Sequence, residues 1–133
     1  MRRDVFVYLA VRDVGQSKNF FGKLGFEFHA KFTDGSTACM IVNDGASVML
    51  VGEPVFRTLT RREPCDTVRL TEALLAVTCP TREAVDELVK RAIAAGGRPA
   101  REPRDQGFLY TWSFHDLDGH QWDAVWMDPA SAP

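Results

Sequence analysis

The chain has 133 residues, 45% of them apolar and 26% charged, a composition that is typical of a globular domain and excludes a disordered or fibrous protein. The formal net charge of −2 leaves no excess of basic residues, so we expect no nucleic-acid partner. The apolar runs are too short for a membrane span and the three cysteines lack CxxC spacing, so we expect no membrane partner and place the protein in the cytoplasm.

The first residues predict a strand and then a helix. Val5–Val11 is rich in β-branched and aromatic side chains, as a buried strand should be. Phe20, Phe21 and Leu24 share one face of a helix that we expect from residue 17 onward. Gly25 follows directly and is suited to end this helix, because glycine readily adopts the left-handed conformation of a C-terminal cap.

Three further strands complete the first half. Residues 26–32 alternate strictly between apolar and polar side chains, which predicts a half-buried strand. Residues 38–42 and 47–51 predict two more strands, and the residues between them include Asn-Asp-Gly at 43–45, a strong hairpin signal. A first module of about 4–52 therefore has the order β-α-β-β-β.

A connector separates the two halves. Residues 53–71 are polar, rich in arginine and interrupted by Pro54 and Pro64. Because proline lacks a backbone N–H and breaks regular hydrogen-bonding patterns, we interpret this segment as a connector between the modules.

The second half repeats the order of the first. Residues 73–79 predict a strand, and Thr81 can cap a helix that ends at Gly96 and Gly97. Three strands are then expected, at 98–100, 108–114 and 120–126. The second module, about 72–128, is again β-α-β-β-β. The repeat predicts an α+β fold in which two βαβββ modules pair into an open mixed sheet that encloses a cleft.

These motifs together resemble one known family. They are VRDV at 11–14, FFGKLGF at 20–26, FHDLDGHQW at 114–122 and WMDP at 126–129. In this order, and with the internal repeat, they resemble the vicinal oxygen chelate superfamily, which includes the glyoxalase and bleomycin-resistance group. The resemblance covers nearly the whole chain and implies a single domain over residues 1–133 that pairs as a homodimer.

The resemblance also implies four positions for the ligands of a divalent metal. Relatives hold the metal with His, Glu or Gln side chains, and the matching positions here are Val7, Met49, Leu74 and Asp123. Valine and leucine have no lone pair to donate, and a thioether is a poor ligand for a hard cation. One carboxylate does not make a metal site. We therefore expect no metal cofactor, with a divalent metal as the minority alternative.

The expected ligand-binding residues lie around the same positions. Asp123 could anchor a ligand cation or act as an acid or base, although a structural carboxylate is an equal alternative. Tyr110 and Trp112 belong to an aromatic stripe that is either core beneath a helix, the favoured interpretation, or a stacking surface in the cleft. The predicted ligand-binding set is Val7, Met49, Leu74, Tyr110, Trp112 and Asp123.

Histidines and arginines offer weaker signals. His115 and His120 flank a tight turn, and we expect both at the surface. Two groups of arginines favour solvated loop charges, with an anionic ligand as the alternative. They are Arg57, Arg61, Arg62 and Arg69 in the first group, and Arg98, Arg101 and Arg104 in the second.

The sequence thus predicts a small-molecule-binding protein of bleomycin-resistance and glyoxalase type. It would sequester a planar or cationic ligand without metal, in a cleft shared across a homodimer. The main alternative is an enzyme of glyoxalase I or dioxygenase type, with a displaced metal site or metal-free acid and base chemistry at Asp123. A third possibility is an interaction module that binds no small molecule.

Overall fold

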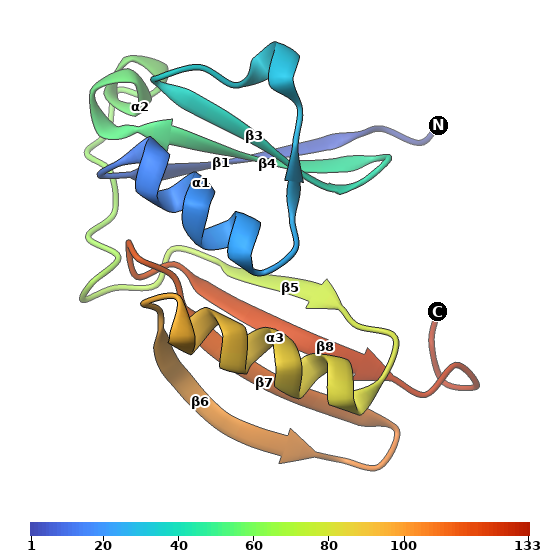
Figure 1. Ribbon diagram of the computed structural model, residues 1–133. Helices are drawn as coiled ribbons and strands as arrows, with labels where there is room; N and C mark the ends of the chain where they lie inside the picture. The colour runs from blue at the N-terminus through green and yellow to red at the C-terminus, as the bar shows by residue number, and fades with distance from the viewer. The chain divides into compact units, whose positions relative to one another are not determined.

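The computed structural model describes residues 1–133 and contains two compact units, Met1–Cys65 and Asp66–Pro133. Figure 1 shows that each unit has one sheet with a long helix against it. Both sheets are four-stranded and mixed, and the fold is α+β with two βαβββ modules, as the sequence predicted. None of the helices is long and apolar enough to cross a membrane.

The first unit has the strand order β1-β4-β3-β2, with β1 parallel to β4 and the other pairs antiparallel. Its elements are β1 (Val5–Val11), α1 (Val14–Lys23), β2 (Glu27–Phe28), the 3₁₀ turn η1 (Ala30–Phe32), β3 (Thr37–Asn43), β4 (Ala46–Gly52) and α2 (Glu53–Leu59).

The core of the first unit lies between α1 and one face of this sheet. Leu9, Leu50 and Ala38 are neighbours across three strands and are at most 3% exposed. Phe20 and Phe21 of α1 are equally buried and meet edge to face, with ring centroids 5.0 Å apart. The predicted apolar stripe of the helix is therefore the one that packs on the sheet.

The second unit has the strand order β5-β8-β7-β6 and repeats the topology of the first. Its elements are β5 (Leu74–Thr78), α3 (Arg82–Ala94), β6 (Arg98–Asp105), β7 (Leu109–His115) and β8 (Gln121–Met127). In each module the first strand pairs in parallel with the last, β1 with β4 and β5 with β8, and the helix that follows the first strand leads to the strand at the opposite edge of the sheet.

Helix α3 covers one face of this second sheet (Figure 1). Thr81 caps it as expected, because its Oγ1 accepts a hydrogen bond from the Ala84 N–H at 3.0 Å. The face that it covers includes Phe114 and Trp122, which are cross-strand neighbours and each 1% exposed. Because side chains alternate along a strand, residues 111, 113 and 123 point to the other face, which we call the open face.

The strand predicted over residues 26–32 is wrong beyond its first residues. Strand β2 ends at Phe28, and residues 30–32 form η1. Strand β2 lies at the edge of the sheet, and β3 is its only partner strand. The Cys39 N–H donates instead to the Thr33 side chain at 3.1 Å, so the backbone turns away from the ladder. An alternating pattern indicates a strand only where a partner strand is available.

Prolines lie within two regular elements of the structure. In the connector 53–71, α2 occupies Glu53–Leu59 and Pro54 lies in its first turn, where the missing N–H has no partner to lose. Strand β6 extends to Asp105 rather than ending at Ala100. It is an edge strand, which tolerates Pro99 and Pro103.

Candidate functional site

The open face of the second sheet carries a row of polar residues in register. Arg101 of β6 pairs with Ser113 of β7, and Ser113 pairs with Asp123 of β8. Directly paired residues have Cβ atoms about 4.5–5.5 Å apart, so a cation, a hydroxyl and a carboxylate stand side by side across three strands. On the next row Arg104 pairs with Thr111.

Two irregularities in β6 put its arginines on this face. Arg98, Arg101 and Arg104 are three residues apart, yet they pair with residues 115, 113 and 111, which are two apart. In a regular strand a three-residue step would send alternate arginines to opposite faces. The register shifts on either side of Arg101 restore the alignment, as β-bulges do when they redirect side chains.

A hollow of about 230 Å³ opens over these rows. Its walls carry two cations, two carboxylates and two hydroxyls, from Arg101, Arg104, Glu102, Asp123, Thr111 and Ser113. The Ser113 side chain is buried, and its Oγ has no hydrogen-bond partner. Gln121 Nε2 donates to Asp123 Oδ1 at 3.1 Å. A buried hydroxyl without a hydrogen-bond partner is unfavourable. A ligand in the hollow could supply the partner that the Ser113 hydroxyl lacks.

The arginines of the hollow have no protein counter-ion. No ion pair or hydrogen bond involves the side chain of Arg101 or Arg104, although other surface arginines such as Arg57 and Arg82 are paired with carboxylates. Both guanidinium groups present a planar fork of N–H donors, which suits a carboxylate or a phosphonate.

The second unit brings together only part of the predicted ligand-binding set. Leu74 lies on the open face with Asp123, because Leu74 pairs with Gln121 and Ala76 pairs with Asp123. Leu74 is 60% exposed and does not line the hollow. Tyr110 and Trp112 alternate with Thr111 and Ser113 and therefore point their side chains toward α3. Trp112 is nevertheless one of the residues that line the hollow.

The aromatic stripe forms the core against α3, the interpretation that the sequence favoured. Tyr110 Oη donates to Asp86 Oδ1 of α3 at 2.6 Å, and this hydrogen bond, together with burial, raises the pKa of Tyr110 to about 12. The Arg82 guanidinium of the same helix lies 4.8 Å from the centre of the Trp126 ring and 5.8 Å from that of Tyr110. These residues fasten the helix to the sheet.

The first unit separates the two residues that it contributes to the predicted set. Val7 pairs with Val48, which is 3% exposed in the core, whereas Met49 pairs with Tyr8 on the opposite face. A shift of one residue along a strand exchanges the two faces, so Val7 does not share a face with Met49 and the position that does is Tyr8.

The residues at the family's metal positions do not fit a metal. Met49 offers a thioether, Asp123 one carboxylate, and Val7 and Leu74 offer nothing, while Tyr8 in place of Val7 adds only a phenol. No group of three or more His, Cys, Asp or Glu side chains is placed to hold a metal ion. A zinc or manganese site takes three or four such ligands.

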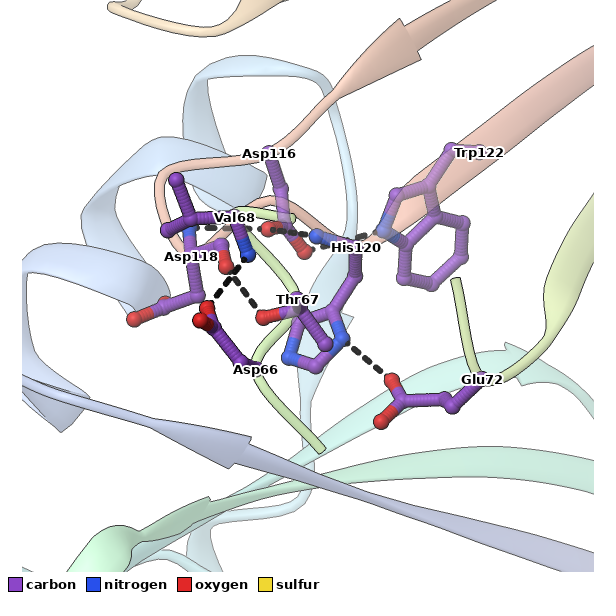
Figure 2. A network of polar contacts seen from close by, with 8 residues as sticks. All are labelled: Asp66, Thr67, Val68, Glu72, Asp116, Asp118, His120 and Trp122. Atoms are coloured by element: carbon purple, nitrogen blue, oxygen red, sulfur yellow. Dashed lines mark hydrogen bonds and ion pairs between the residues drawn. The ribbon is translucent and has the colours of Figure 1, made fainter. Parts of the chain in front are cut away.

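A second polar cluster surrounds the turn between β7 and β8 (Figure 2). Asp116 Oδ1 accepts from the N–H groups of Asp118 and His120 at 2.9 and 3.0 Å, and its Oδ2 accepts from Trp122 Nε1 at 3.0 Å. Asp116 is 5% exposed, and this burial raises the pKa of its carboxyl group despite the hydrogen bonds. The carboxylate organises the turn.

The segment before β5 packs against this turn (Figure 2). Thr67 Oγ1 donates to the Asp118 carbonyl at 2.5 Å, and Glu72 Oε1 lies 2.7 Å from His120 Nδ1. The surface position predicted for His120 is therefore wrong, since it is 3% exposed, whereas His115 is half-buried. The contact of His120 with Glu72 joins residues 48 positions apart in sequence, and no local pattern signals such a contact.

Comparison with known protein families agrees with this topology. The model of the Glyoxalase/Bleomycin resistance protein/Dioxygenase superfamily matches residues 4–124, which span the first module and the second as far as the middle of β8. The protein belongs to this superfamily. The family resemblance that the sequence motifs indicated is thus confirmed for the glyoxalase superfamily as a whole. A search of the curated proteins gave no significant match.

Several solved structures share the glyoxalase-superfamily fold. A hypothetical protein from S. aureus is 25% identical with a TM-score of 0.80, over 94% of each chain. A glyoxalase-related enzyme from Fulvimarina pelagi is 20% identical with a TM-score of 0.81, over 95% of this chain and 88% of that one. Another is a mutant of the fosfomycin resistance protein FosX from Listeria monocytogenes, in complex with Mn(II) and dihydroxypropylphosphonic acid. It is 20% identical with a TM-score of 0.66, over 93% of this chain and 90% of that one. The likeness is one of fold.

Sequence reasoning missed several residues of the hollow. Ser113 and Thr111 carried no signal, because a small hydroxyl within a strand is common and its partners depend on the register. Arg101 and Arg104 did carry one, since they form a run of arginines at three-residue spacing. The sequence favours solvated charge for this run, because the bulges in β6 are not visible in it.

Proposed function

We propose that this member of the glyoxalase superfamily binds a small molecule, without a metal, in the hollow beside Asp123. The observation that carries the proposal is the unpaired, buried hydroxyl of Ser113 next to the Asp123 carboxylate in that hollow. Both groups can bond to a ligand that brings hydrogen-bond donors, and Asp123 suits an ammonium group.

The size of the hollow limits the ligand. A volume of about 230 Å³ is below the ~300–1,000 Å³ of pockets for drug-sized molecules, so we propose a metabolite-sized ligand or one end of a larger one. A cationic group on the ligand remains supported by Asp123. A planar ligand has no such support, because Tyr110 and Trp112 direct their rings to the α3 side.

A screen by nuclear magnetic resonance tests this proposal. Small amines, acids, neutral polar compounds and aromatic compounds would be added to isotope-labelled protein, and the shifted backbone amides identified. We expect hits that shift Thr111, Ser113 and Asp123, and we expect Asp123→Asn to weaken amine hits about ten- to a hundredfold, since a charge-assisted bond contributes roughly 1.5–3 kcal/mol.

The control for this screen is Asp128→Asn. Asp128 follows β8 and lies outside the hollow, so its replacement changes the net charge equally without touching the site. Hits that map only to other surfaces, or an equal loss of affinity in both variants, would contradict the proposal.

We further propose that the protein works as a homodimer. Phe6 and Tyr8 lie on the same strand of the first unit, on the face opposite its core, and are 56% and 49% exposed. Exposed aromatic side chains grouped in this way are typical of protein interfaces. Sedimentation equilibrium should give about twice the chain mass of 14.9 kDa, and Phe6→Ser with Tyr8→Ser should shift the mass toward one chain. A wild-type monomer at tens of micromolar, about the range in which ordinary dimers persist, would refute it.

A further inference from the structure

We infer that the ligand of this hollow carries an acidic group at one end, held by Arg101 and Arg104, and an ammonium or hydroxyl donor at the other end, held by Asp123. This inference rests on the proposed function and adds the chemical class of the ligand. Small amino acids and hydroxy acids belong to that class.

The placement of charges in the hollow supports two ends rather than one. Arg101, Ser113 and Asp123 occupy consecutive strands in one row, so the backbone positions that carry the cationic and anionic side chains are two strand spacings apart, roughly 9–10 Å. The hydroxyl of Ser113 lies between them and is unpaired. A ligand that spans the row would contact all three groups.

The absence of an internal ion pair makes this arrangement available to a ligand. Neither Arg101 nor Arg104 forms a salt bridge, and Asp123 accepts its hydrogen bond from an uncharged amide, that of Gln121. Opposite charges that share a hollow without pairing leave both sets of hydrogen-bonding sites open. Glu102 also lines the hollow, so its charges sum to zero. A ligand with both an acidic group and a hydrogen-bond donor can contact the arginines and Asp123 at once. A simple anion can contact only the arginines, and a simple cation only the carboxylates.

The β-bulges of β6 are a further observation in favour of a binding role. A regular edge strand would leave one or two of its three arginines on the face that α3 covers. Instead, the register shifts place all three on the open face, and two of them line the hollow. Bulges commonly redirect side chains next to functional sites.

Four matched probes test the inference. β-Alanine carries an acid and an ammonium group, 3-hydroxypropionate an acid and a hydroxyl, propionate the acid alone, and propylamine the ammonium alone. Titrations followed by the amide shifts of Thr111, Ser113 and Asp123 would give the dissociation constant of each probe. We expect β-alanine or 3-hydroxypropionate to bind at least about tenfold more tightly than either single-ended probe, because each charge-assisted contact is worth that much or more. Whichever of the two binds more tightly identifies the donor.

Three variants separate the two ends. Arg101→Gln should weaken β-alanine and propionate and leave propylamine unchanged. Asp123→Asn should weaken β-alanine and propylamine and leave propionate unchanged. Arg98→Gln is the matched control, because Arg98 lies on the same face of β6 outside the hollow and should change none of them. Arg101 and Arg98 are both exposed, so neither replacement should affect folding.

Several results would overturn the inference. Propylamine binding as tightly as β-alanine would show that the arginine end contributes nothing. Equal changes in the dissociation constant of β-alanine in Arg101→Gln and Arg98→Gln would also show that Arg101 does not hold the ligand. If none of the four probes bound while the wider screen still gave hits beside Asp123, the ligand class would be wrong and the proposed function would stand. If neither experiment gave binding in the hollow, the proposed function itself would fail.

Discussion

Gly119, in the turn before β8, is the position at which one methyl group should disturb the second unit most. Its φ of +88° favours glycine, and an added Cβ would lie 2.9 Å from the Thr67 carbonyl carbon and closer still to the carbonyl oxygen. Alanine in the left-handed region costs roughly 1–2 kcal/mol. The clash is with backbone, so the segment at Thr67 must move and its hydrogen bond to Asp118 is lost, at about 0.5–1.5 kcal/mol.

Gly119→Ala should therefore lower the free energy of unfolding by roughly 1.5–3.5 kcal/mol. Gly107→Ala is the matched control, because Gly107 has a similar φ of +82° with nothing within 4 Å of the added Cβ. It should cost only the conformational part, about 1–2 kcal/mol. Urea unfolding followed by circular dichroism gives both values on the same scale.

Equal free energies of unfolding for Gly119→Ala and Gly107→Ala would contradict this prediction. That result would mean that the segment at Thr67 does not pack on the turn. Thr67→Ala provides a second reading if Gly119→Ala fails to fold. It removes the 2.5 Å hydrogen bond alone and should cost about 0.5–1.5 kcal/mol.

Three further predictions concern single side chains. Asp116→Ala leaves three N–H donors without their acceptor and should cost about 3–5 kcal/mol in urea unfolding; a loss below about 1 kcal/mol would contradict the network. In a Tyr8→Phe background Tyr110 is the only tyrosine, and ultraviolet titration should place its pKa at about 12, moving toward the ordinary value near 10 in Asp86→Asn; no movement would show that Asp86 is not the cause. Ser113→Ala removes an unpaired buried hydroxyl and should leave the ligand-free protein equally stable or up to about 1 kcal/mol more stable, whereas a clear loss would mean that the hydroxyl has a partner.

Elements with local signals were predictable from the sequence. The β-branched run of Val5–Val11 became β1, and Thr81 caps α3 through a hydrogen bond three residues along. Gly25 and Gly96 take positive φ angles just beyond the two long helices. In each case the physical cause lies within a few residues, so a single sequence contains it.

The features of the site depend on contacts between distant residues and were not predictable in the same way. Whether residues 26–32 continue as a strand depends on the partner β3, and His120 is in contact with Glu72, which is distant in sequence. The face of β6 on which Arg101 lies is set by bulges against β7. Asp123 was predictable because its position in the family motif is counted from a nearby turn glycine, Gly119. The role of Ser113 depends on its pairing with Arg101 and Asp123, which the sequence does not reveal.

A crystal structure of the protein with the tightest hit of the screen tests the central claim most directly. The claim is that the hollow on the open face, between β6 and β8, is a ligand site. It predicts the ligand in that hollow, with a donor on the Asp123 carboxylate and a hydrogen bond to the Ser113 hydroxyl. A saturating ligand bound elsewhere, with only water beside Asp123, would contradict it.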